Sequence, residues 1–297
     1  MGIALRRIES GTLAILYTPR PAGRLSYTCD TESDVTGAGM MRLAVLSDIH
    51  GNLPALEAVV ADIARRGVDQ VLNLGDNLSG PLLPAETAGL LMGQAWVQIA
   101  GNHDRELARR DPGDLIPSDA FARAQLQPEM VRWLAGLPPS ATVAGGVQLL
   151  HGTSRRDTEC LLETIERSAA RLATPAEIEA RLAGAQAEVI LCGHSHIPRS
   201  VRTPAGMLIV NPGSVGMQAY EHDDPEYHIM QTGSPDARYA VIEKRAGQWS
   251  AQLLTVPYDT RTVVELARRN GRPEWASGLA SGYFLPAASR LRPAGNA

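Results

Sequence analysis

Short runs of aliphatic residues alternate with segments of helical periodicity from residue 42 onward. The first six runs have the length and composition of buried β-strands, and we predict these strands at 43–46, 71–74, 96–100, 147–150, 189–192 and 207–210. Two further strands are predicted at 239–243 and 249–255. This alternation is typical of an α/β fold in which helices pack on an aliphatic sheet.

Capping residues and apolar spacing predict three helices. The first begins at Asn52, carries four apolar residues on one face and ends at Gly67. The second begins at Thr174, where Glu177 completes a capping box three residues later. The last covers about residues 261–269. The first helix and its two flanking strands form a βαβ unit, which requires parallel strands.

The composition excludes several classes of protein. A chain of 297 residues that is 44% hydrophobic can bury a full core. Its formal charge of −4 provides no basic surface for duplex nucleic acid. We find no apolar run of the roughly 20 residues that span a bilayer, so no membrane partner is expected. Three widely spaced cysteines, Cys29, Cys160 and Cys192, predict neither disulfides nor a thiolate zinc site, which fits a cytoplasmic protein.

The chain divides into an N-terminal extension at residues 1–39, a domain at 40–283 and a C-terminal tail at 284–297. Met40 and Met41 stand directly before the first strong strand. We therefore expect either that translation starts there or that the extension is a genuine but disordered tail.

Five of the seven histidines lie in short motifs that follow predicted strands. The motifs, with a Gly-Asp pair among them, are Asp48-Ile49-His50, Gly75-Asp76, Gly101-Asn102-His103-Asp104, His151-Gly152 and Gly193-His194-Ser195-His196. The carboxyl ends of parallel strands converge on one crevice, so these side chains are expected to meet. In an extended chain, residues two apart, such as Asp48 and His50, point to the same side. Imidazole and oxygen ligands without thiolate indicate a metal site.

The order of these motifs resembles the calcineurin-like metallophosphoesterases over residues 48–196. The segments 211–216 and 256–259 also resemble the small bacterial branch of that family, which extends the likeness from 41 to about 283. The family fold is a four-layer α/β/β/α sandwich with two central mixed β-sheets. The resemblance therefore implies this fold for the predicted domain.

The resemblance also implies two metal ions, Mn, Fe or Zn, that share one carboxylate. One ion would be held by Asp48, His50, Asp76 and His196, and the other by Asp76, Asn102, His151 and His194. A shared carboxylate holds two cations roughly 3.5 to 4 Å apart, close enough to clamp one phosphoryl group. His103 resembles the family's catalytic histidine at the leaving oxygen. Asp104 would either orient His103 or cap a helix.

The implied reaction is hydrolysis of a small phosphodiester or nucleotide by in-line attack of a metal-bridging hydroxide. Protein phosphatases of the family carry Asp-Arg-Gly after the second motif, whereas this chain has Asn77, Leu78 and Ser79 there. The missing arginine disfavours a protein substrate. Two alternatives stay open, namely a phosphomonoesterase with the same site and a non-catalytic scaffold such as the retromer subunit of this fold. Homo-oligomerisation is left open as well.

Two further segments lie near the expected crevice. The polar stretch 220–234 contains His222 and His228 and is predicted to be a surface loop. Residues 211–216 contain Pro212 and two glycines, and we favour a turn there over an anion-binding nest.

Overall fold

The structure is a computed structural model and describes residues 5–7, 13–15 and 40–285. The chain divides into two compact units, 1–37 and 38–297. In the first unit, β1 (Leu5–Arg7) pairs antiparallel with β2 (Leu13–Ile15). The remainder of the predicted N-terminal extension, and nearly all of the predicted C-terminal tail, lie outside the described residues.

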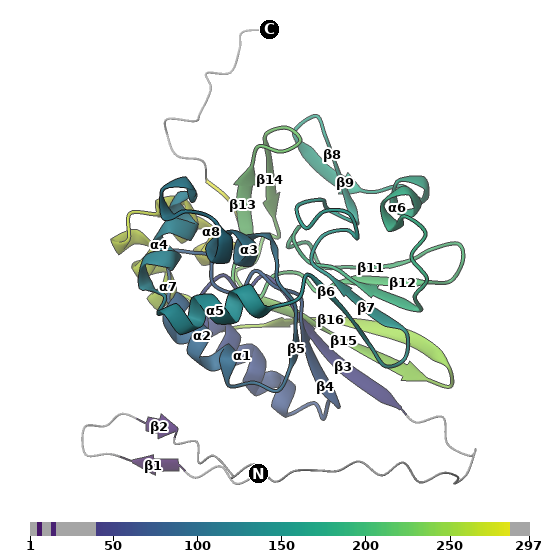
Figure 1. The fold of residues 1–297 in the computed structure, drawn as a ribbon, viewed down its shortest axis with the longest axis horizontal. Helices are drawn as coiled ribbons and strands as arrows, with labels where there is room; N and C mark the ends of the chain where they lie inside the picture. The colour runs from purple at the N-terminus through teal and green to yellow at the C-terminus, as the bar shows by residue number, and fades with distance from the viewer. Residues whose placement is uncertain (1–4, 8–12, 16–39, 286–297) are drawn as a thin grey trace, which may run out of the picture. The chain divides into compact units, whose positions relative to one another are not determined.

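Two five-stranded mixed sheets form the centre of the second unit (Figure 1). The first has the strand order β16 (Gln248–Val256), β15 (Ala237–Arg245), β3 (Met41–Leu46), β4 (Gln70–Asn73) and β5 (Val97–Gln98). The second has the order β11 (Arg199–Arg202), β12 (Leu208–Asn211), β10 (Val189–Leu191), β7 (Val147–Leu150) and β6 (Ser140–Val143). Strands β3, β4 and β5 are parallel, as are β7, β10 and β12, and the outer partners run antiparallel.

The sheets pack on each other through the aliphatic side chains predicted to be buried. Leu43 and Leu72 from the first sheet share one core with Val189 and Leu191 from the second. The intervening Ile190 points to the opposite face, as strand alternation requires. Both faces of each sheet are thus apolar, which explains why the strands read as continuous hydrophobic runs.

Helices cover the outer face of each sheet (Figure 1). The first sheet is covered by α1 (Leu53–Ala64), α2 (Pro84–Met92), α3 (Asn102–Arg109), α4 (Pro117–Gln125) and α5 (Pro128–Gly136). The second is covered by α6 (Pro175–Leu182), whose Ile178 and Leu182 pack on Ile190 and Ile209. The four-layer α/β/β/α fold is therefore confirmed. No helix among the described residues has both the length and the apolarity to cross a membrane.

The predicted caps form as the sequence indicates. Asn52 accepts a hydrogen bond from the backbone N–H of Ala55, and Thr174 and Glu177 form a reciprocal capping box. The helix α7 spans Arg261–Arg269, as predicted, and α8 (Pro273–Ser281) follows it.

The prediction of a surface loop at 220–234 is wrong. Strands β13 (Ala219–His222) and β14 (His228–Gln231) form a hairpin there, and the side chain of His228 is buried. A second hairpin, β8 (Glu163–Glu166) and β9 (Ala169–Leu172), lies beside it, and Ser168 donates its backbone N–H to Glu226. The sequence pattern predicts neither hairpin. Short strands that are exposed on one side contain many polar residues, so their apolar pattern is weak.

Candidate metal centre

The seven predicted ligands lie together at the carboxyl ends of the parallel strands. The loop after β3 carries Asp48 and His50, and the loop after β10 carries His194 and His196. The remaining three are Asp76 after β4, His151 after β7 and Asn102 at the start of α3. All are buried except His194, which is partly exposed. Both sheets therefore contribute to one centre.

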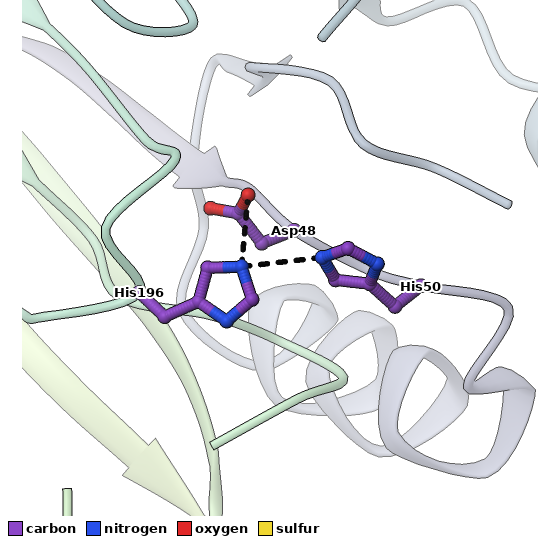
Figure 2. A group of neighbouring side chains, drawn as sticks. All are labelled: Asp48, His50 and His196. Atoms are coloured by element: carbon purple, nitrogen blue, oxygen red, sulfur yellow. Dashed lines mark hydrogen bonds and ion pairs between the residues drawn. The ribbon is translucent and has the colours of Figure 1, made fainter. Parts of the chain in front are cut away.

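Asp48, His50 and His196 form the first ligand group (Figure 2), and their potential ligand atoms lie within 4.8 Å of one another. The Nε2 atoms of His50 and His196 are 3.2 Å apart, and Asp48 Oδ1 is 3.3 Å from His196 Nε2. The Nδ1 atoms of these rings donate to backbone carbonyls, His50 to Ser79 at 2.9 Å and His196 to Met217 at 2.7 Å. Both Nε2 atoms therefore face each other and the carboxylate.

Asp76, His151 and His194 form the second ligand group, again with ligand atoms within 4.8 Å. His151 Nδ1 donates to the carbonyl of Leu74 at 2.8 Å, which turns Nε2 toward Asp76 Oδ2 at 3.1 Å. Asn102 Oδ1 lies 3.1 Å from His194 Nδ1 and joins this group. Asp76 Oδ1 accepts the backbone N–H of His103, which leaves Oδ2 facing the centre.

The donor atoms of both groups fit divalent cations. Within the described residues, both carboxylate oxygens of Asp48 and Nε2 of His151 are buried without a hydrogen-bond partner. A buried carboxylate with no donor is costly, so the two Asp48 oxygens need a positive charge beside them. Burial and the neighbouring His196 lower the pKa of His50 to about 4, so its ring does not supply that charge at neutral pH. For His151 burial acts in the same direction, but Asp76 outweighs it and raises the pKa to about 10, so Nε2 lies where either a proton or a cation balances the carboxylate of Asp76.

Five of the predicted ligands adopt a left-handed backbone, with φ between 52° and 64° (Asp48, His50, Asp76, His194 and His196). The expectation that each DxH or HxH pair is extended is therefore wrong. The left-handed region costs about 1–2 kcal/mol per non-glycine residue, so neighbouring loops must hold it. Backbone bonds from Asp48 to Gly75 and from His50 to Asp76 do so. Close approach also needs glycine, because a Cβ on Gly75 would lie 2.2 Å from the backbone of Gly101.

The 211–216 loop joins the two ligand loops rather than only reversing the chain. Asn211 donates through Nδ2 to the carbonyl of Gly193, next to His194. Ser214 Oγ and the backbone N–H of Gly216 both donate to the carbonyl of Asp48. The loop thereby fixes a ligand loop of one sheet against a ligand loop of the other.

His103 lies at the exposed side of the centre, and its side chain is 23% exposed. Its Nδ1 is 3.0 Å from Oδ1 of Asp119, a fully buried carboxylate on α4. Burial opposes a charge on this ring, but the carboxylates of Asp76 and Asp119 outweigh it and raise the pKa of His103 to about 10. The carboxylate of Asp119 thus favours the protonated ring and binds its Nδ1, while Nε2 makes no bond to Asp119.

Of the two roles left open for Asp104, the structure shows the helix cap. The Asp104 carboxylate accepts backbone N–H groups from Asp76, Asn77 and Gly101, which caps α3 and fixes the loop after β4. Adjacent residues on a helix do not face each other, so Asp104 points away from His103. Asp119 holds His103 instead. It lies in no motif, and only the packing of α3 against α4 brings it there.

Residues 41–234 match the model of the calcineurin-like phosphoesterase superfamily domain, and the chain belongs to this superfamily. A metallophosphoesterase from Sphaerobacter thermophilus has a similar crystal structure, with a TM-score of 0.64 and 26% identity over 82% of this chain and 100% of that chain. A hypothetical protein from Pyrococcus horikoshii has the same TM-score and coverage at 19% identity, which shows a common fold.

A protein of uncharacterised function from Methanocaldococcus jannaschii is 25% identical over 247 residues, which cover 78% of this chain and 94% of that protein. The family and the fold implied by the motifs are therefore confirmed.

Proposed function

We propose that this chain is a two-metal phosphoesterase that hydrolyses a small phosphodiester or nucleotide. The main support is that two groups of potential metal ligands meet at one centre, where buried nitrogen and oxygen atoms have no hydrogen-bond partner. Asp48, His50 and His196 would hold one cation, and His151, His194 and Asn102 the other. Asp76 would be common to both. Bound cations would supply an activated water and neutralise charge on the phosphoryl oxygens.

His103 acts as the general acid in this proposal. Its Nδ1–H is bonded to Asp119, so Nε2–H remains for the leaving oxygen. The ring is partly exposed, so a substrate would be able to reach it. Donation of this proton forms the leaving alcohol, and the carboxylate of Asp119 keeps the ring oriented throughout.

The charges around His103 favour a diester over a monoester. Arg105, two residues after His103, is held by Asp157 in a bidentate pair with distances of 2.6 and 3.0 Å. Arg272, which reaches α4 beside Asp119, is paired with Glu274. Neither arginine is free to grip a phosphate. A monoanionic diester needs less compensation than a dianionic monoester, so the cations and His103 suffice for it.

The test is turnover by the metal-loaded protein on matched nitrophenyl phosphodiesters and phosphomonoesters, with nucleotides alongside. We expect the diester to have the higher kcat/KM and His103→Ala to lower kcat by about 10²–10⁴-fold. His222→Ala on the β13–β14 hairpin is the control. A higher kcat/KM on the monoester would establish the phosphomonoesterase instead. No turnover with two cations bound would favour the scaffold.

A further inference from the structure

Two C-terminal helices, α7 and α8, lie beyond the residues that match the family model. Their buried side chains form a cluster with one residue from each of two site segments. The cluster contains Leu82, Met217, Val263, Val264, Ala267, Trp275, Ala276 and Leu279. Met217 provides the carbonyl that holds His196, and Leu82 lies three residues after Ser79, whose carbonyl holds His50. The helices therefore pack behind both supports of the first ligand group.

Trp275 on α8 contacts that group directly. Its side chain is buried, and its ring centroid lies 6.0 Å from that of His50 in an edge-on arrangement at 73°. Gly80 makes room for this contact, because a Cβ there would lie 2.9 Å from the indole and 2.7 Å from the carbonyl of His50. The indole thus lies close to both the Gly80 backbone and the His50 ring.

Polar contacts fix the position of α8. Asn270, just before it, donates through Nδ2 to the carbonyl of Pro81 at 2.8 Å. Arg272 lies over the indole, 5.9 Å from the ring centroid, and donates to Ser118 Oγ at 3.0 Å. Ser118 precedes Asp119, so α8 is connected both to His50 and to the segment that orients His103.

We propose that Trp275 is a positioning residue for the first ligand group and that α7 and α8 are part of the metal centre. This inference rests on the proposed function for the identity of the ligand, a divalent cation. The ring of His50 is fixed at Nδ1 by Ser79 and at its edge by the indole. Loss of the indole frees the ring and the 79–82 segment, so a cation must then order both. The second ligand group is anchored by Leu74 and α3, which belong to other core clusters than Trp275.

The test compares two buried tryptophans in the full chain. Trp275→Leu and Trp275→Phe are matched with Trp249→Leu and Trp249→Phe. Trp249 is also buried. In the first sheet it lies opposite Lys244, which in turn lies opposite Met41 at the start of β3. Trp249 is therefore at the other end of the strands from the proposed ligands. Each protein is titrated with Mn²⁺ and its two dissociation constants are measured by calorimetry, with thermal unfolding recorded without metal.

We expect Trp275→Leu to weaken one of the two cations about tenfold and to leave the other unchanged, as is typical for outer supports of a metal site. Trp275→Phe should restore part of that affinity, since it retains an aromatic edge. Trp249→Leu should lower stability without changing either constant. Unchanged constants in Trp275→Leu, or equal weakening of both cations in the two Leu variants, would overturn the inference.

A spectroscopic measurement applies even if Trp275→Leu does not fold. Co²⁺ quenches indole emission at short range, so the wild-type protein should lose emission on Co²⁺ binding. Trp275→Phe should remove most of the quenched part and Trp249→Phe should not. Equal quenching in the two variants would place Trp275 too far from the cation. Neither the metal affinities nor the quenching depends on turnover. If the protein binds both cations but does not hydrolyse esters, the proposed function is refuted and the inference about Trp275 is not.

Discussion

The two ligand groups use the same kinds of donor but are supported differently. In the second group, His151 is held by the carbonyl of Leu74, directly after β4, and Asn102 lies on α3. In the first group, His50 and His196 are held by carbonyls of loop residues, Ser79 and Met217. The second group is thus supported partly from the end of β4 and from α3. The first depends on loops that later segments must support.

Part of the support for the first group lies outside the family match. The matched residues end at 234 and include every proposed ligand. The packing behind the first group nevertheless comes from α7 and α8, and the 211–216 loop adds hydrogen bonds to Asp48. The motifs therefore contain every proposed ligand, but they do not contain all the residues that pack behind those ligands.

The largest effect is expected from Asp76→Ala, which removes the carboxylate proposed to be common to both groups. We expect both cations to be lost together. Metal-dependent stabilisation, about 2.7 kcal/mol per site when free metal is at 100 times Kd, should then vanish. Thermal unfolding with and without Mn²⁺ measures it. Asp111→Asn, at an exposed position, is the control. Retention of one full metal-dependent increment would show that the groups do not share Asp76.

A smaller effect is expected from Asp119→Asn, which acts on His103 and on neither group. The carboxylate raises the pKa of His103, so a neutral amide should lower it. We expect kcat to fall about 10²-fold, with the alkaline limb of the kcat–pH profile moved to lower pH, because the protonated ring is then lost earlier. Metal affinity should not change. An unmoved alkaline limb would remove His103 as the acid that sets it.

The sequence predicts that the proposed ligands meet at one crevice but does not predict what supports them, and the reason is physical. Asp48, His151 and His196 follow buried strands, whose apolar runs and parallel pairing place them at one crevice. Asp119 and Trp275 reach the centre only through packing between helices, which leaves no local pattern. The left-handed backbone at Asp48 cannot be predicted from the sequence either, because backbone hydrogen bonds to distant loops impose it and the residue type does not.

Ser214→Ala should distinguish the two groups more finely. Its hydroxyl donates to the carbonyl of Asp48 at 2.7 Å and accepts the N–H of Met217 at 2.8 Å. We expect the first cation to weaken by up to about tenfold while the second keeps its affinity. Gly216 still donates to the same carbonyl, which limits the loss. The measurement is a Mn²⁺ titration, with the exposed Ser250→Ala as control. Equal weakening of both cations would contradict separate support.

The smallest effect tests whether stability and metal binding can be separated. Thr174 caps α6 on the outer face of the second sheet, and its side chain accepts the N–H of Glu177. Thr174→Ala should lower the free energy of unfolding by about 1 kcal/mol and Tm by about 2–4 °C. Both cation affinities should stay at the wild-type value, and Thr174→Ser should restore Tm. A change in the affinity of the first cation in Thr174→Ala would show that the loops of the first group respond to global stability. The local supports at Ser79 and Met217 would then not account for the difference between the groups.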